Sequence, residues 1–104
     1  VAYVPAAATP SEVLELRELG FKIQKLFPAG ASGGIDMLKS LSSPIADVRF
    51  CPTGGVSTSN VNDYLKQPNV ICVGGSWLAP KNLVAEKNWA AITRIVRDSM
   101  AAVS

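Results

Sequence analysis

Short apolar runs alternate along the chain with longer segments in which apolar residues recur every three or four positions. The runs are typical of strands buried in a parallel sheet, and the longer segments are typical of amphipathic helices. This pattern predicts strands at about 1–4, 21–27, 48–52 and 70–73, each followed by a helix. The predicted helices carry their apolar faces at Val13, Leu16 and Leu19, at Ile35, Leu38 and Leu41, at Val61, Tyr64 and Leu65, and at Trp89, Ile92, Val96, Met100 and Val103.

Polar and special residues mark where the helices begin and end. Thr9 and Glu12 have the spacing of a capping box, which predicts a helix that begins just after Thr9. Gly20 is a natural stop for that helix. The next two helices are predicted to end before Pro44 and Pro68, because proline cannot continue a helix.

Repeated strand–helix units with short connections predict an α/β protein whose parallel sheet is covered by helices. Two architectures fit this order of elements, an open doubly wound sheet and half of an eight-unit barrel. The length of the units does not separate them, so the pattern alone leaves both open.

Composition narrows the functional classes. The 104 residues suffice for one small domain, and a net charge of +2 without a basic cluster argues against a nucleic-acid partner. No apolar run approaches the roughly 20 residues of a membrane-spanning helix. The chain opens at Val1 inside an apparent strand, which suggests a piece of a longer polypeptide.

The sequence offers little to a metal-dependent mechanism. It contains no histidine, which excludes a Ser–His nucleophile pair within the chain and leaves few ligands for zinc. Its two cysteines, Cys51 and Cys72, lie in apolar runs and are interpreted as small buried thiols. We therefore expect neither a metal site nor a disulfide.

Lys25 is the candidate nucleophile. Strand alternation places it on one face with Phe21, Ile23 and Phe27. A charged ammonium is costly among large apolar neighbours, and a neutral amine can attack a carbonyl group. The alternative is a lysine whose stem is buried while its amine bends out to solvent.

Glycine pairs end the last two predicted strands, and each pair has a hydroxyl residue beside it. Functional groups gather at the carboxyl ends of strands in parallel α/β folds. Glycine also lets backbone N–H groups turn toward an anion. The pattern favours a phosphate site over two simple tight turns. Its residues are Thr53, Gly54, Gly55, Gly74, Gly75 and Ser76.

Two further observations concern charged groups. Arg49 shares a strand face with Cys51 and Thr53, so it is either an interior charge below Lys25 or a solvated charge at the start of the strand. None of the eight carboxylates falls at the carboxyl end of a predicted strand, so the chain offers no candidate general base.

Three runs carry a resemblance to a known family. Residues 21–29, 48–55 and 72–77 closely resemble 2-keto-3-deoxy-6-phosphogluconate (KDPG) aldolase, the class I aldolase of the Entner–Doudoroff pathway. The likeness extends along the whole chain, with a departure at Gly30, where relatives often carry an acidic residue. It implies a (βα)8 TIM barrel of about twice this length. Residues 1–104 would form the C-terminal half of that domain, strands five to eight.

The resemblance also implies roles for the candidate residues. Lys25 would form the Schiff base with the keto acid, and the iminium would act as the electron sink without a metal or organic cofactor. Thr53 and Phe27 would line the substrate pocket. The phosphate would be held by Gly54, Gly55, Gly74, Gly75 and Ser76.

The implied reaction is reversible cleavage of KDPG into pyruvate and glyceraldehyde 3-phosphate, with hydroxy-oxoglutarate or galactonate analogues as further substrates. The implied protein is a cytoplasmic homotrimer whose catalytic glutamate lies in the N-terminal half of the barrel. Two other functions stay open. One is a half-barrel that binds phosphate without turnover, and the other is a different phosphate-binding barrel enzyme whose lysine forms no imine.

Overall fold

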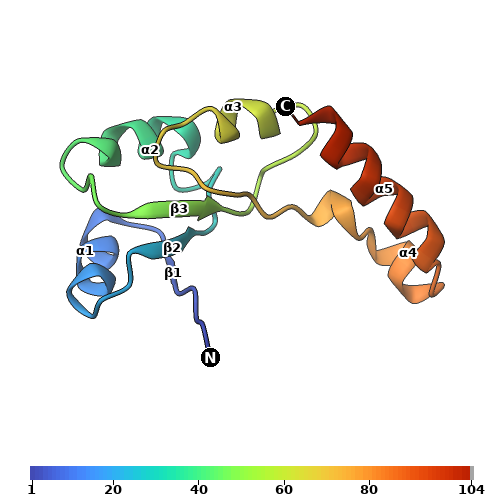
Figure 1. Cartoon of the computed structure of the whole chain (residues 1–104), viewed down its shortest axis with the longest axis horizontal. Helices are drawn as coiled ribbons and strands as arrows, with labels where there is room; N and C mark the ends of the chain where they lie inside the picture. Colours follow the sequence, from blue (N-terminus) through green and yellow to red (C-terminus); the bar gives the residue numbers. More distant parts are fainter. Residues whose placement is uncertain (104) are drawn as a thin grey trace.

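A computed structural model describes residues 1–103. Short strands and helices alternate along the first two thirds of the chain, and helices make up the last third (Figure 1). The elements are β1 Ala6–Ala7, α1 Pro10–Glu18, β2 Ile23–Leu26, α2 Gly34–Ser42, β3 Arg49–Pro52, α3 Val61–Leu65, the 3-10 turn η1 Ser76–Leu78, α4 Lys81–Ala85 and α5 Trp89–Ala102.

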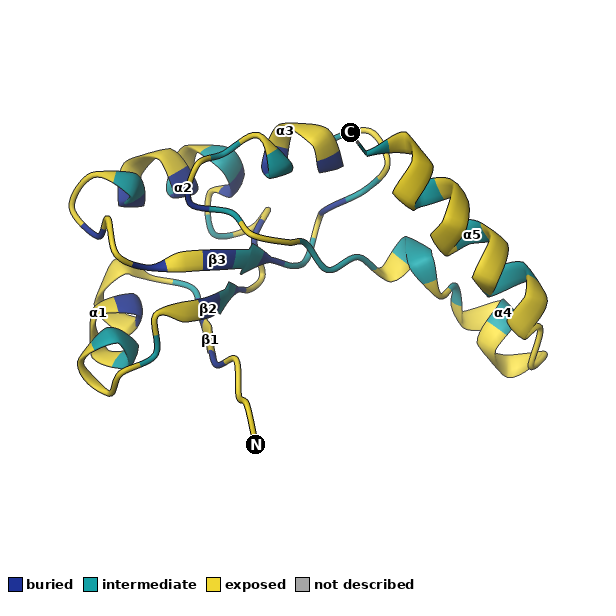
Figure 2. Cartoon of the chain, in the orientation of Figure 1, coloured by how far each residue is buried: buried dark blue, intermediate teal, exposed yellow. Residues whose placement is uncertain are grey.

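The three strands form a parallel sheet in the order β1-β2-β3. One face of this sheet packs against helices α1, α2 and α3, and the buried segments in Figure 2 mark that interface. The core between them contains Ala7, Val13, Leu26, Leu38, Leu41, Phe50, Val61 and Tyr64. The opposite face carries no helix in the described part of the chain, so the sheet is covered on one side.

Two buried amides tie the helices to the strands. Gln24 is fully buried, and its Nε2 donates to the carbonyl oxygens of Val13 at 3.1 Å and Phe21 at 2.9 Å. Asn69 is also buried, and its Nδ2 donates to the Leu38 carbonyl in α2 at 2.9 Å. These bonds give the buried amide N–H groups acceptors, and such groups are costly to bury without a partner.

The first helix begins as the sequence predicts. The Glu12 N–H donates to Thr9 Oγ1 at 3.2 Å, and Glu12 Oε1 accepts from the Ala8 N–H at 3.1 Å. The hydrogen bond from Ala8, followed by that from the Thr9 hydroxyl, holds the pKa of Glu12 below its usual value. The helix ends at Glu18, and Gly20, just after the C-cap residue Leu19, has a φ of 94°, the left-handed conformation expected of a glycine stop.

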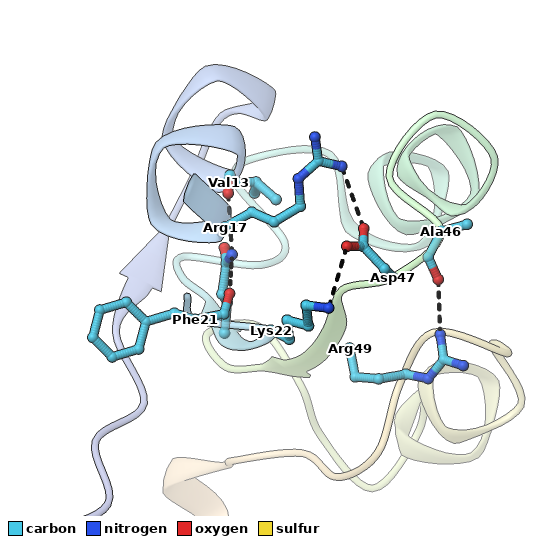
Figure 3. Close-up of polar contacts among 8 residues, drawn as sticks. Val13, Arg17, Phe21, Lys22, Ala46, Asp47 and Arg49 are labelled. Atoms are coloured by element: carbon cyan, nitrogen blue, oxygen red, sulfur yellow. Dashed lines mark hydrogen bonds and ion pairs between the residues drawn. The ribbon is translucent and has the colours of Figure 1, made fainter. Parts of the chain in front are cut away.

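Charged side chains gather at the amino end of the sheet (Figure 3). The Asp47 carboxylate forms two ion pairs. One is with Arg17 Nη1 at 3.3 Å, and the other is with Lys22 Nζ at 4.0 Å. Arg49, at the start of β3, is exposed and donates to the Ala46 carbonyl at 3.3 Å. Of the two interpretations of Arg49, the structure favours a solvated charge at the start of the strand.

The first strand is not where the sequence predicts it. Residues 1–4 form no ladder, and β1 is Ala6–Ala7 instead. Backbone hydrogen bonds from β2 explain the shift, because the Lys25 N–H donates to the Pro5 carbonyl at 2.8 Å and the Phe27 N–H donates to Ala7 at 3.1 Å. The pairing register with β2 therefore places the strand several residues later than local hydrophobicity does.

The fourth predicted strand is not formed as a continuous ladder. Residues 70–74 follow the edge of β3 through two isolated bridges, Phe50↔Val70 and Thr53↔Gly74. Three steps along β3 thus correspond to four steps along its neighbour, which is the mismatch of a β-bulge. The fold is a parallel α/β sheet with helices, as predicted, but among residues 1–103 the fourth strand–helix unit lacks a continuous strand.

The last helices extend away from the sheet as an arm formed by α4 and α5 (Figure 1). The final helix, α5, covers the range that its apolar spacing predicts. Its C-terminal end lies next to α3, where Asn62 Nδ2 donates to the Ala102 carbonyl at 3.4 Å. An apolar cavity of about 290 Å³ lies between these two helices. Within residues 1–103, no helix combines the length and the apolar character needed to cross a membrane.

Candidate active site

Lys25 lies on the face of the sheet that the helices leave open. Its neighbours Gln24 and Leu26 are fully buried toward the helices, whereas Lys25 itself is half-buried on the other side. The parallel register sets Lys25 between Ala6 of β1 and Cys51 of β3. The alternation predicted from the sequence is confirmed for this strand.

The Lys25 amine lies beside an aromatic ring and outside the ion pairs of the structure. Its Nζ is 5.3 Å from the centroid of Phe27, within reach of a cation–π contact, and the Phe27 side chain is about half exposed. The ion pairs among residues 1–103 join Arg17 and Lys22 to Asp47. Lys25 is therefore in no ion pair among the described residues.

Thr53 follows directly on β3, where two loops come together. Its N–H donates to the Leu26 carbonyl at 2.9 Å, and its carbonyl accepts from the Ala29 N–H at 2.8 Å. The Gly30 N–H then donates to the Gly54 carbonyl at 3.0 Å. These hydrogen bonds join the loop after β2 to the loop after β3. Lys25 and Thr53 therefore lie near the same carboxyl end of the sheet.

The first glycine pair has a conformation that favours glycine. Gly54 and Gly55 have φ angles of 94° and 77°, and a Cβ on Gly54 would lie 3.2 Å from the Pro28 Cα. Asn60 holds this loop in place, because its Nδ2 donates to the Gly55 carbonyl at 2.9 Å and its Oδ1 accepts from the Ser57 N–H at 2.8 Å.

Asn60 is a supporting residue that the sequence reasoning did not single out. Its position just before the third helix, after Ser57 and Ser59, is the only local signal of this role, since asparagine often hydrogen-bonds nearby backbone groups in turns.

The second glycine pair lies next to the first through the Thr53↔Gly74 bridge, and the Gly74 N–H donates to the Pro52 carbonyl at 3.0 Å. A Cβ on Gly74 would lie 2.8 Å from Thr53 Oγ1, and a Cβ on Gly75 would overlap the ring of Trp77. A side chain at either position would therefore displace a neighbouring side chain, and the Gly74 backbone lies close to Thr53.

Backbone donors at these loops have no partner among the described residues. Within residues 1–103, four N–H groups of the two loops donate to no other group of the chain. They belong to Gly54, Gly55, Gly75 and Ser76. Unpaired N–H groups on adjacent loops at the carboxyl edge of a parallel sheet are suited to an anion such as phosphate.

The interpretation of the cysteines as buried thiols is wrong. Cys51 is half-buried and Cys72 is exposed, because Cys51 is on the same face as Lys25 and Cys72 follows the bulge beside it. Partial burial of the Cys72 thiol, then its hydrogen bond to Cys51 and the charge of that group, raise its pKa to about 11.

The carboxylates do not reach the lysine. All eight lie within the described residues, and the one nearest in sequence to a strand's carboxyl end, Glu12, is engaged in capping α1. Within residues 1–103, no group of three or more His, Cys, Asp and Glu side chains is arranged to hold a metal ion. The site thus consists of a lysine, a threonine and two donor loops.

A parallel α/β sheet that is covered by helices on one side, with glycine-rich loops at the carboxyl ends of its strands, is the kind of structure found in parts of (βα)8 barrels. The sequence profile of one such family, "KDPG and KHG aldolase", matches residues 1–95. The chain belongs to the KDPG and KHG aldolase family.

Individual relatives agree with this assignment. A 2-dehydro-3-deoxy-phosphogluconate aldolase of Pseudomonas aeruginosa is 47% identical over 100 residues, which cover 96% of this chain and 46% of the relative. The KDPG aldolase structure from Legionella pneumophila, described with pyruvate as a covalent carbinolamine intermediate, has a TM-score of 0.87 and 44% identity, over 97% of this chain and 48% of that one.

A third relative has a phosphorylated ligand. The Zymomonas mobilis ZM4 aldolase structure with 3-phosphoglycerate has a TM-score of 0.81 and 37% identity, over 97% of this chain and 49% of that one. The chain spans about half the length of the relatives it matches.

Proposed function

We propose that the protein containing this chain is a class I aldolase that cleaves KDPG to pyruvate and glyceraldehyde 3-phosphate. The observation that carries the proposal is the position of Lys25, on the open face, at the carboxyl edge, and outside the described ion pairs. The carbinolamine in the Legionella pneumophila relative supports it, because that intermediate forms when an amine adds to the ketone of pyruvate.

The proposed chemistry begins at the Lys25 amine. Its nitrogen attacks the C2 ketone of the substrate to give a carbinolamine, and loss of water gives a protonated imine. A base removes the proton of the C4 hydroxyl, the C3–C4 bond breaks, and its electron pair moves into the iminium to form an enamine. Glyceraldehyde 3-phosphate leaves, the enamine takes a proton at C3, and water releases pyruvate from the lysine.

The remaining candidate residues would hold the substrate. We assign the phosphate to the unpaired N–H groups of the two glycine loops and to the Ser76 hydroxyl. Thr53 and Phe27 would contact the keto-acid portion, because both lie at the carboxyl edge next to Lys25. The 3-phosphoglycerate described for the Zymomonas mobilis relative supports a site that accepts a phosphorylated three-carbon acid.

The base and the rest of the barrel are assigned to a part of the protein outside this chain. No carboxylate of the chain forms an ion pair with Lys25 in the described residues, and the relatives are about twice as long. We infer that an N-terminal half completes a (βα)8 barrel and supplies the base. The complete enzyme would be a cytoplasmic homotrimer, as the family resemblance implies.

Separate production of the two halves tests this assignment. Residues 1–104 alone should show no aldol cleavage, and mixing them with the preceding half of the protein should restore activity. Sedimentation velocity of the reconstituted protein measures the trimer. A stable monomer of residues 1–104 with full activity would refute the assignment of the base to the other half.

The central experiment traps the imine in the complete protein. Pyruvate with borohydride should label the peptide that contains Lys25 and leave Lys22, three residues away and paired with Asp47, unlabelled. Lys25→Arg should abolish both labelling and cleavage, because a guanidinium keeps its charge and forms no imine. Lys22→Arg is the matched control and should keep both. Cleavage without any label at Lys25 would contradict the proposal.

A further inference from the structure

The two cysteines of the chain are held next to each other by backbone hydrogen bonds. The Ile71 N–H donates to the Phe50 carbonyl at 3.0 Å, and the Gly74 N–H donates to the Pro52 carbonyl at 3.0 Å. Cys51 lies between the two acceptor residues on β3, and Cys72 lies between the two donor residues on the neighbouring segment. The backbone is thus fixed on both sides of the pair.

This arrangement suits a covalent link between the two thiols. Neighbouring strands run about 4.8 Å apart, and the Cα atoms of disulfide partners are usually about 4.4–6.8 Å apart. Cys51 also contributes to the raised pKa of the Cys72 thiol, as expected for two thiols on adjacent segments. Both cysteines are free in this structure.

We propose that Cys51 and Cys72 form a dithiol site that a small disulfide oxidant, such as oxidised glutathione, closes into an intramolecular disulfide. A thiolate of the pair attacks one sulfur of the oxidant and expels one thiol, which leaves a mixed disulfide. The second thiol of the pair then attacks the protein sulfur and expels the other thiol. Two protein S–H groups are oxidised, and one oxidant molecule is reduced to two thiols.

The link would lie inside the proposed active site. Cys51 is the register partner of Lys25, and its Sγ lies 3.9 Å from the Oγ1 of Thr53. Cys72 is two residues before Gly74, where the second donor loop begins. A disulfide would draw the Cys51 Sγ toward Cys72 and away from the Thr53 hydroxyl, so oxidation should lower aldolase activity and a thiol reductant should restore it. This consequence rests on the proposed function, whereas the disulfide itself does not.

Peptide mapping of the complete protein tests the site. The protein is incubated with oxidised glutathione in its native state at mildly alkaline pH, because the thiolate is the form that attacks a disulfide and its fraction rises with pH. It is then unfolded, alkylated and digested with trypsin, which places the cysteines in separate peptides, 50–66 and 67–81. We expect these two peptides to be recovered as one species joined by a disulfide, and to separate after reduction.

Single variants provide the control. In Cys51→Ser and in Cys72→Ser, the remaining thiol should stop at the mixed disulfide with glutathione, and activity should change less than in the oxidised native protein. Recovery of both native peptides as alkylated thiols, or as separate glutathione adducts, would overturn the proposal. Because the linked peptide is read from the native sequence by mass, this result stands even if a variant fails to fold or the aldolase assignment fails.

Discussion

Alanine at position 74 should disturb the site through the Thr53 side chain rather than through the backbone. Gly74 is not among the residues with a positive φ, so alanine can adopt its conformation. Its Cβ, however, would lie 2.8 Å from Thr53 Oγ1 and 3.2 Å from Thr53 Cγ2. Both γ atoms of a β-branched side chain are then too close, and Thr53 must turn about χ1 to a less favourable position.

The size of the effect follows from the bond that would be lost. If the Thr53 hydroxyl binds the charged substrate, its removal costs about 1.5–3 kcal/mol, the range for a hydrogen bond to a charged group. Since about 1.4 kcal/mol corresponds to a tenfold change in rate, kcat/KM for KDPG should fall about 10- to 150-fold. The strained rotamer adds about 0.5–1.5 kcal/mol to the cost of folding.

The assay is cleavage of KDPG by the complete protein, followed through the pyruvate released. Gly30→Ala is the matched control, because a Cβ there would lie 3.6 Å from the Gly54 carbonyl oxygen, an ordinary contact, and kcat/KM should stay near that of the native enzyme. Thr53→Val removes the hydroxyl and keeps the branched shape.

A double-mutant cycle then decides the mechanism. If Gly74→Ala acts through the Thr53 hydroxyl, then adding Gly74→Ala to the Thr53→Val variant should lower kcat/KM little further. Full additivity of the two losses, or an unchanged kcat/KM for Gly74→Ala alone, would refute the reasoning.

Two further predictions address the phosphate and the core. Ser76→Ala should lower kcat/KM for KDPG by about 10- to 150-fold and affect 4-hydroxy-2-oxoglutarate much less, because only the first substrate has a phosphate to bind. Equal losses on both substrates would mean that Ser76 only shapes its loop. Gln24→Met should lower the free energy of unfolding in urea by about 1–3 kcal/mol, since it removes the two hydrogen bonds that Gln24 Nε2 donates to the Val13 and Phe21 carbonyls. Gln67→Met is its control, because the Gln67 side chain is half-buried and donates to the Asp63 carbonyl in a solvent-exposed hydrogen bond, and equal effects of the two would contradict the argument.

The sequence was sufficient to place Lys25 on the correct face and edge. Strand alternation is a local property of the backbone, so the separation of Lys25 from Gln24 and Leu26 could be read from residue order alone. The boundaries of α1 were equally predictable, because Thr9 and Glu12 act within one turn of each other. For these elements, the residues that determine the local structure lie within a few positions of each other in the sequence.

Features that depend on distant partners were not predictable in the same way. The position of β1 is set by hydrogen bonds from Lys25 and Phe27 of β2, and local hydrophobicity at residues 1–4 gives no sign of that register. The bulge that interrupts residues 70–74 also arises from pairing with β3. It turns Cys72 toward Cys51, so the thiol pair could not be foreseen from the spacing of two cysteines in sequence.

The open face of the sheet links the stability of this chain to its proposed chemistry. Ile23, Phe27 and Ile71 are each about half exposed, and Lys25 is only half-buried. Burial of such apolar surface is the main favourable term in folding, so the strands proposed to complete the barrel would gain stability by covering it. The same cover would remove water from around the amine, and desolvation favours the neutral form of an amine that attacks a ketone. Burial of this one surface would therefore both stabilise the assembly of the two halves and activate the lysine.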